Sequence, residues 1–129
     1  YQMQSIAKKV VDSGNDKILI TDRGTSFGYN NLVVDMRGVQ IIQDELGYPL
    51  VFDATHSVQI PGGHGGSSAG ERKFVPLLAK AAIAAGAKAL FFEIHPNPEK
   101  ALCDGDNMLP LDSCEETFDI CNKIFKLVN

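Results

Sequence analysis

The chain has 129 residues, 44% of them hydrophobic and 22% charged, which fits one globular domain and excludes disordered, collagen-like and low-complexity chains. Twelve basic residues against sixteen acidic ones give a formal net charge of −4, so we expect no nucleic-acid partner, because nucleic-acid-binding proteins carry a basic face. No apolar run reaches the ~18 residues that a membrane-spanning helix needs, so we expect no membrane partner either.

The first part of the chain predicts a helix, a strand and a second helix. Residues 3–11 carry apolar side chains at helical spacing. Residues 17–21 are a short apolar run, typical of a buried strand, which ends at Asp22-Arg23-Gly24. A loop rich in glycine and asparagine follows, and then a helix over residues 33–46 that ends at Gly47.

The order strand, loop, helix then occurs twice more. Residues 49–56 are a second apolar strand, which precedes a glycine-rich segment and a helix over residues 71–85. Residues 89–95 are a third strand, which precedes a loop and a last helix with Asp112 or Ser113 as its N-cap. We expect the inner face of the last helix to carry Phe118, Cys121, Ile124, Phe125 and Val128.

Alternating helices and strands, with strands that are apolar almost throughout, predict an α/β fold with a parallel sheet covered by helices. Each of the three strands ends in ionisable residues, and long loops follow them. Because chemistry in such folds gathers at the carboxyl ends of the parallel strands, we expect the functional residues there.

The three cysteines, Cys103, Cys114 and Cys121, lie in the last quarter of the chain and form no CxxC pair. Their odd number disfavours a disulfide framework and favours a reducing cytoplasm. Cys114 and Cys121 share one face of the last helix, so we expect both to be small buried apolar groups.

Two segments are candidates for binding a substrate. Arg23 suits a phosphate or a carboxylate, although a structural ion pair with Asp22 is an equal alternative. Residues 62–70 contain five glycines together with Ser67 and Ser68, which favours either a mobile lid over a substrate or a merely flexible surface loop. This segment has neither the P-loop nor the dinucleotide-binding glycine pattern, so both of those interpretations are weak.

His56, Glu93 and Asp104 form a candidate metal site. His56 and Glu93 lie at the ends of two predicted strands and Asp104 lies in the loop that follows, so a parallel sheet would bring all three to one rim. An imidazole and two carboxylates suit a divalent transition metal, although each residue taken singly is better explained as a capping or hydrogen-bonded loop residue. His64 and His95 are weaker candidates.

Three stretches of the chain resemble the 3-deoxy-D-manno-octulosonate-8-phosphate synthases. They are RGTSFGYNNLVVDM (residues 23–36), FDATHSVQIPGG (residues 52–63), and FEIHP with the later CDG (residues 92–105). The resemblance runs essentially from end to end of the chain, and its motifs are long and in order. The related 3-deoxy-heptulosonate-7-phosphate synthases have a similar general arrangement of motifs, but the first stretch favours the octulosonate family.

The resemblance implies a TIM-barrel enzyme that condenses phosphoenolpyruvate with arabinose 5-phosphate and releases phosphate, in lipopolysaccharide sugar synthesis. It implies that His56, Glu93 and Asp104 are three of the four ligands of a divalent metal ion, with His56 and Asp104 catalytic. The run CDGDNM (residues 103–108) looks like the metal-dependent subclass. The fourth ligand would be a cysteine near the start of the barrel, which this sequence lacks, and iron, zinc and manganese would all suit the partial set.

The resemblance also implies substrate contacts and an assembly. Arg23 would hold the phosphate of phosphoenolpyruvate, and Ser57 and Asp104 would touch substrate. Gln59 and the loop over residues 60–69 would cover the aldose phosphate. The lysines expected around phosphoenolpyruvate are absent from this sequence. The resemblance implies a homotetramer that is located in the cytoplasm.

A TIM barrel usually takes about 250 residues and eight strands, so we interpret residues 1–129 as the C-terminal half of one barrel domain whose N-terminal half is absent. Two accounts stay open. The chain supplies part of the active site of a full synthase, or it is a truncated, non-catalytic half-barrel that binds phosphate ligands or a partner chain. A flavodoxin-like binding domain is disfavoured, because three strands are too few for it.

We expect the isolated 129-residue chain not to form a stable monomer, because a slice of a barrel leaves two sheet edges and one layer of side chains uncovered. Thermal melts of the isolated chain over a wide range of concentrations check this expectation. A cooperative melt that does not change with concentration would contradict it.

Overall fold

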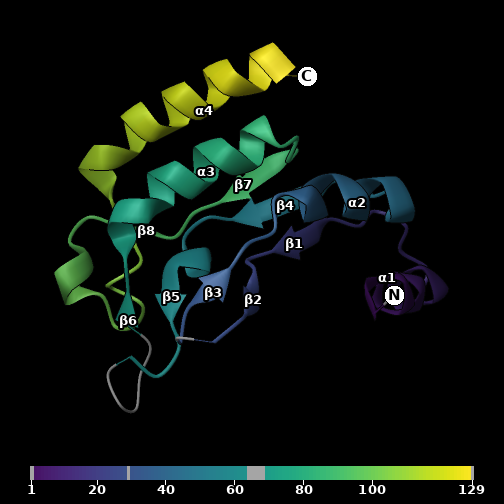
Figure 1. Ribbon diagram of the computed structural model, residues 1–129, viewed down its shortest axis with the longest axis horizontal. Helices are drawn as coiled ribbons and strands as arrows, with labels where there is room; N and C mark the ends of the chain where they lie inside the picture. The colour runs from purple at the N-terminus through teal and green to yellow at the C-terminus, as the bar shows by residue number, and fades with distance from the viewer. Residues whose placement is uncertain (1, 29, 64–68, 129) are drawn as a thin grey trace.

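The centre of the fold is a parallel three-stranded sheet. The structure is a computed structural model that describes residues 2–28, 30–63 and 69–128. The sheet has the order β1 (Ile20–Asp22), β4 (Leu50–Asp53), β7 (Ala89–Phe91) (Figure 1). Asp22 pairs with Phe52 across the first two strands, and Asp53 pairs with Phe91 across the next two. The parallel α/β sheet predicted from the sequence is confirmed.

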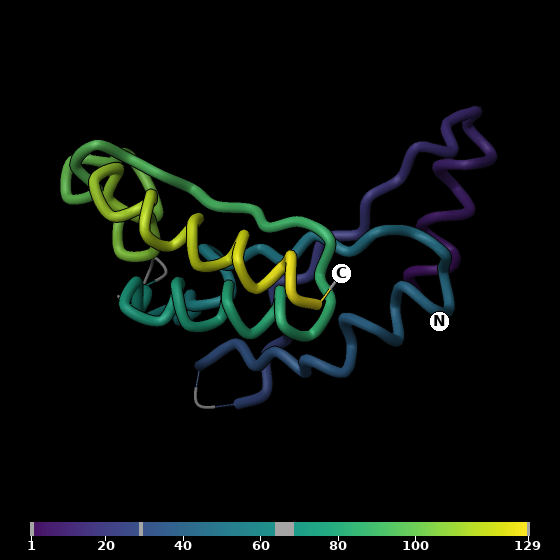
Figure 2. The backbone as a smooth tube through the Cα atoms, turned by 90° about the horizontal axis from the view of Figure 1, so that it is seen from above, coloured from purple at the N-terminus to yellow at the C-terminus, as the bar shows by residue number. Residues whose placement is uncertain are grey.

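Within the described residues the chain forms four α-helices: α1 (Gln2–Asp12), α2 (Arg37–Leu46), α3 (Val75–Ala84) and α4 (Cys114–Val128). Figures 1 and 2 show α3 and α4 side by side on one face of the sheet, with α1 at the far end of the molecule from α4. The expected C-cap of α2 is confirmed, because Gly47 has a left-handed φ of 73° and its N–H donates to the carbonyl of Gln43.

Two helices begin later than the sequence pattern indicated. The helix expected from residue 33 begins at Arg37, because Leu32–Val33 forms β3 and pairs antiparallel with β2 (Thr25–Ser26). The helix expected from residue 71 begins at Val75, after a 3-10 turn (η2, Arg72–Phe74). The residues before these two helices form a hairpin strand in one case and a 3-10 turn in the other, and the sequence pattern alone does not distinguish either from a first helical turn.

The third predicted strand is divided. Residues 89–91 form β7, whereas Ile94–His95 forms β8, which pairs in parallel with β9 (Leu109–Pro110). The strand β9 lies in a segment that we expected to be a loop. Similarly, β5 (Gln59–Ile60) pairs antiparallel with β6 (Ala69–Gly70) in the glycine-rich segment where neither helix nor strand was expected. All four are two-residue strands, too short to produce a periodic pattern.

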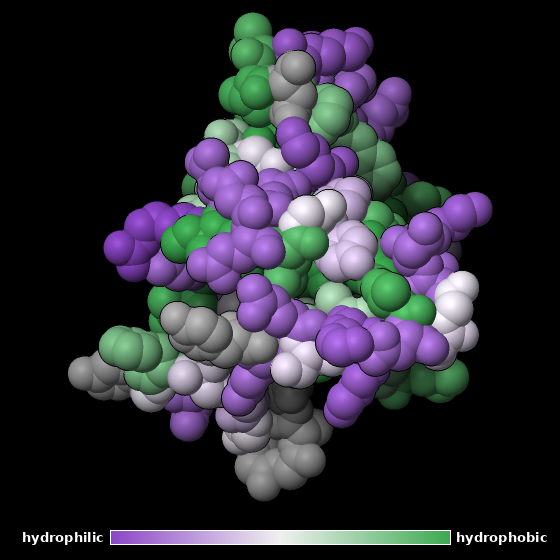
Figure 3. Space-filling model, turned by 90° about the vertical axis from the view of Figure 1, so that its right-hand side faces the viewer, coloured by the Kyte–Doolittle hydropathy of each residue, from purple (hydrophilic) through white to green (hydrophobic). Residues whose placement is uncertain are grey.

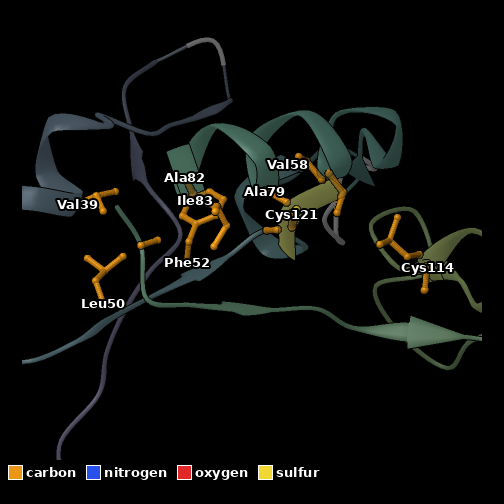
Figure 4. Close-up of a cluster of buried hydrophobic side chains, with 13 residues drawn as sticks. Val39, Leu50, Phe52, Val58, Ala79, Ala82, Ile83, Cys114 and Cys121 are labelled. Carbon is orange, nitrogen blue, oxygen red and sulfur yellow. The ribbon is translucent and has the colours of Figure 1, made fainter. Parts of the chain in front are cut away.

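The core lies between the sheet and the helices that cover it (Figure 4). Leu50 and Phe52 of β4 are fully buried against α3 and the loops around it. Cys114 and Cys121 are 4% and 5% exposed, which confirms that they are small buried core groups. The predicted inner face of α4 is confirmed in part. Cys121 is buried and Ile124 and Phe125 pack against the core, whereas Phe118 and Val128 are 41% and 48% exposed.

Among the described residues, no α-helix lies over the other face of the sheet (Figure 1). Side chains alternate along a strand, so Val51 points away from the buried pair Leu50 and Phe52. The register puts Thr21 and Ala89 beside Val51 on this second face. Phe91 lies two residues beyond Ala89 in β7, so its side chain is on the same face. Phe91 is 46% exposed, so the second face presents apolar surface to solvent.

Apolar side chains also reach the surface elsewhere. The side view in Figure 3 shows them among polar ones at the end of the molecule that carries α1, and Ile6, Val11 and Leu19 are exposed large apolar residues of that region. In the part of the chain that the structure describes, none of the helices combines the length and the apolar character needed to cross a bilayer.

The burial pattern predicts a large loss of stability for one leucine substitution and a negligible one for another. Leu50→Ala should lower the free energy of unfolding by about 2–5 kcal/mol, because it opens a cavity in a closely packed core. Leu127→Ala should change it by less than about 0.5 kcal/mol, because Leu127 is 84% exposed. Chemical denaturation of the two variants measures both values, and equal losses of unfolding free energy would contradict the described packing.

Candidate metal centre

The position of His56 is set by the acidic residue that ends β4. Asp53 is 8% exposed, and its Oδ1 accepts a hydrogen bond from the backbone N–H of His56 at 2.9 Å. Its Oδ2 lies 2.8 Å from Nδ1 of the same histidine. Because Nδ1 donates to this carboxylate, a neutral imidazole presents the lone pair of Nε2. His56 therefore turns its Nε2 away from Asp53 as a possible ligand atom.

Glu93 occupies the break between β7 and β8. Its backbone N–H donates to Oγ1 of the fully buried Thr55 at 2.8 Å, and its carbonyl accepts from the N–H of Leu109 at 3.0 Å. Its side chain reaches back to the end of β4, where Oε2 lies 3.0 Å from Nε2 of His56. The break in the strand thus turns Glu93 toward the histidine.

Asp104 comes from a tight turn after β8. Its φ of 52° is left-handed, which is uncommon for a residue other than glycine. Its carbonyl accepts from the N–H groups of Asn107 and Met108 at 2.9 and 3.2 Å. Its carboxylate Oδ1 accepts from Nε2 of Gln59 at 2.7 Å. The turn therefore directs the carboxylate toward β5, where Gln59 lies.

The structure brings His56, Glu93 and Asp104 together, as their positions in the sequence indicated. One possible ligand atom from each lies within 4.8 Å of the other two, and all three residues are partly buried. One imidazole nitrogen and two carboxylate oxygens suit a divalent transition metal such as manganese, iron or zinc. Metal-binding histidines commonly donate their other nitrogen to a carboxylate, as His56 does to Asp53. The residues present fit a divalent cation.

Arg23 and Gln59 continue the site toward β1. Nη1 of Arg23 donates to Oε1 of Gln59 at 3.2 Å, while the Asp22 carboxylate accepts the N–H of Gly24 at 2.8 Å. The guanidinium is thus directed at Gln59, which in turn donates to Asp104. Arg23 is exposed, so most of its donors are accessible to an anion.

Other residues singled out from the sequence have different surroundings. Ser57 is 3% exposed and its hydroxyl donates to the carbonyl of Ala54 at 2.9 Å, so its contact with substrate stays a prediction. Nδ1 of His95 accepts from the N–H of Asn97 at 2.9 Å, a local turn contact. His64, Ser67 and Ser68 lie outside the described residues, so the lid expected there stays a prediction.

The site carries concentrated negative charge. The Asp104 carboxylate, through a hydrogen bond and its charge, raises the pKa of the neighbouring Cys103 thiol, and Glu93 adds to the effect. A raised pKa keeps this exposed thiol protonated at neutral pH. Cys103 therefore acts as a neutral neighbour of the acidic pair rather than as a thiolate.

Three residues of this region were missed from the sequence as supports of the site: Asp53, Thr55 and Arg72. Asp53 had a recognisable signal, because it ends an apolar strand three residues before a histidine, the spacing of a side chain that caps a turn. Thr55 and Arg72 had none, because their contacts with Glu93 and with the loop of Asp104 join segments that are far apart in the sequence.

Comparison with known proteins identifies similar chains. Residues 1–129 match the DAHP synthetase I family. The chain is 58% identical over 117 residues to a 2-dehydro-3-deoxyphosphooctonate aldolase of Syntrophotalea carbinolica, covering 91% of this chain and 42% of that protein. It is 55% identical over 126 residues to a protein of the same name from Syntrophobacter fumaroxidans, covering 98% of this chain and 43% of that protein. The chain thus spans about two-fifths of the length of these relatives.

The charge around Cys103 gives a pH-dependent prediction. Asp104→Asn should lower the pKa of the thiol, because the substitution removes the carboxylate that raises it. The thiolate fraction at pH 8 then increases, so iodoacetamide should alkylate Cys103 faster than in the unsubstituted protein. Peptide mass spectrometry of the metal-free protein measures the rate. Asp106→Asn is the matched control, and equal rates in the two variants would contradict the described electrostatics.

Proposed function

We propose that this chain, which belongs to the DAHP synthetase I family, forms the metal-binding part of an enzyme that condenses phosphoenolpyruvate with arabinose 5-phosphate. The products are 3-deoxy-D-manno-octulosonate 8-phosphate and phosphate. The similarity to 2-dehydro-3-deoxyphosphooctonate aldolases supports this substrate class. The observation that carries the proposal is the convergence of His56, Glu93 and Asp104 to within 4.8 Å. The activity is that of a whole protein of which this chain is a part.

In this proposal three residues hold a divalent cation. Nε2 of His56 and the carboxylates of Glu93 and Asp104 are its ligands on this chain, and a further ligand would come from outside it. When bound, such a cation orients and polarises the aldehyde of the sugar phosphate without redox chemistry. Asp53 keeps the imidazole in the tautomer that ligation requires, since its carboxylate accepts from Nδ1.

The neighbouring polar residues bind and orient the two phosphorylated substrates. The exposed guanidinium of Arg23 suits the phosphate of phosphoenolpyruvate, because its planar set of donors matches phosphate oxygens. Gln59 lies between Arg23 and Asp104 and donates to the latter at 2.7 Å, so it fixes the spacing between the anion site and the metal site. Ser57 and the loop over residues 60–69 complete the proposed substrate contacts.

The open face of the sheet supports the view that the chain is one part of a TIM barrel. In a barrel, the side chains of each strand alternate between the interior and the surrounding helices. Leu50 and Phe52 meet helices, whereas Val51 and Phe91 belong to the face without them. We propose that residues 1–129 form the C-terminal half of the barrel and that the other half covers this face.

We also propose a cytoplasmic homotetramer, on the resemblance to the octulosonate family. The three free cysteines, one exposed and two buried, suit a reducing compartment.

The intact polypeptide that contains this chain tests the proposal. Given phosphoenolpyruvate, arabinose 5-phosphate and Mn²⁺, it should release phosphate, and chelation should stop the release. His56→Ala should lower kcat/KM by about 100-fold or more, because loss of a ligand costs more than the 10–100-fold typical of an outer partner. His95→Ala is the matched control and should retain activity.

Two outcomes would contradict the proposal. Phosphate release that is unaffected by both chelation and His56→Ala would exclude the metal site. Binding of the two substrates without turnover would favour the alternative, a non-catalytic half-barrel. Turnover by the isolated 129-residue chain would contradict the claim that it carries only part of the active site.

A further inference from the structure

The turn that carries Asp104 is anchored by one arginine from a distant segment. Arg72, in the 3-10 turn before α3, donates from Nη2 to the carbonyl of Gly105. Its own backbone N–H donates to the carbonyl of Asp106 at 3.2 Å. Two consecutive carbonyls directly after Asp104 are therefore held by one residue.

The turn needs such support because its conformation is strained. The left-handed φ of Asp104 is uncommon for a residue other than glycine and persists only where its surroundings hold it. The turn is also tightly packed, since a Cβ added to Gly105 would lie 2.5 Å from the carbonyl oxygen of Pro98. The turn has little room to move toward Pro98, and Arg72 limits its movement away from α3.

The side chain of the next residue, Asn107, contributes packing rather than polar contacts. Asn107 is 1% exposed, and both polar atoms of its side chain lack a hydrogen-bond partner among the described residues. Its Oδ1 fills the space that a Cβ of Gly70 would occupy, at 1.5 Å from that position. The Asn107 side chain therefore packs between the turn and β6 and keeps the two apart. Arg72 supplies the hydrogen bonds that hold the turn in place.

The carbonyl contacts of Arg72 matter more than its ion pair. Nη2 also lies 3.2 Å from the Glu99 carboxylate, whose side chain is 75% exposed, whereas that of Arg72 is 28% exposed. A pair with such an exposed carboxylate contributes little, because water and salt screen it. The hydrogen bond to Gly105 is charge-assisted and partly buried, which makes it stronger.

We propose that Arg72 is a positioning residue, which sets the place of the Asp104 carboxylate relative to His56 and Glu93 by holding the carbonyls of Gly105 and Asp106. This inference rests on the metal site proposed above. Arg72 does not touch the metal ligands' donor atoms. It acts through the backbone of the Asp104 turn. Loss of its side chain removes the hydrogen bond to Gly105 and keeps the backbone bond to Asp106, so it should widen the range of positions of one carboxylate and leave the other two ligands in place.

Co²⁺ binding to the intact polypeptide tests the proposal, because the visible absorption of Co²⁺ reports the number and geometry of its ligands. Arg72→Ala should raise the Kd for Co²⁺ by about 10–100-fold, the range for partners that orient a ligand, and should change the visible spectrum. Lys73→Ala is the neighbouring control, and Glu99→Ala removes only the ion pair. Both should leave the Kd and the spectrum unchanged.

A second measurement does not depend on metal. The amides of Asn107 and Met108 both donate to the carbonyl of Asp104, so their hydrogen exchange reports whether the turn is closed. In the metal-free protein, Arg72→Ala should accelerate this exchange while Lys73→Ala should not. Arg72→Lys keeps a donor and should show a smaller change in both the exchange and the Kd.

The outcomes separate this inference from the proposed function. Unsubstituted protein that binds no Co²⁺ would overturn the metal site, and the role inferred for Arg72 with it. Normal binding with an unchanged Kd, spectrum and amide exchange in Arg72→Ala would overturn the inference alone. If Arg72→Ala does not fold, Arg72→Lys decides: unchanged values again overturn the inference, whereas a weaker Kd with faster exchange supports it.

Discussion

The parallel register of three short strands is the constraint on which the candidate site depends. Asp22 pairs with Phe52, and Asp53 pairs with Phe91, so the three strands end at the same edge of the sheet and within about one residue of one another in register. Arg23, His56 and Glu93 are the residues that follow within a few positions of those ends. An antiparallel arrangement would separate them, because successive strands would then end at opposite edges.

Beyond the strand ends, the site is held by groups that satisfy exposed backbone donors and acceptors. Asp53 accepts the N–H of His56, and Thr55 accepts the N–H of Glu93. Leaving such buried groups unpaired would cost about 1–3 kcal/mol each. The same contacts therefore stabilise the loops and orient the side chains proposed as metal ligands. This coupling explains why residues that touch no substrate in the proposal still matter for its geometry.

Much of the architecture could be predicted from the sequence, because it follows from long patterns. Four α-helices and the three parallel strands come from apolar periodicity and from caps such as Gly47. The two-residue strands β8 and β9 could not be predicted, because they are too short for a pattern and form only when Ile94 meets Leu109. The convergence of His56 and Glu93 was predictable from the strand ends, whereas the Arg72 contact with Gly105 joins residues 33 positions apart without a sequence signal.

Anomalous diffraction from crystals of the intact polypeptide grown with Mn²⁺ or Zn²⁺ tests the central claim most directly. The account predicts one strong peak about 2.0–2.2 Å from Nε2 of His56 and from carboxylate oxygens of Glu93 and Asp104, with the contact between Asp53 and Nδ1 of His56 retained. A peak bound elsewhere, or full metal content with these three side chains turned away from it, would contradict the account.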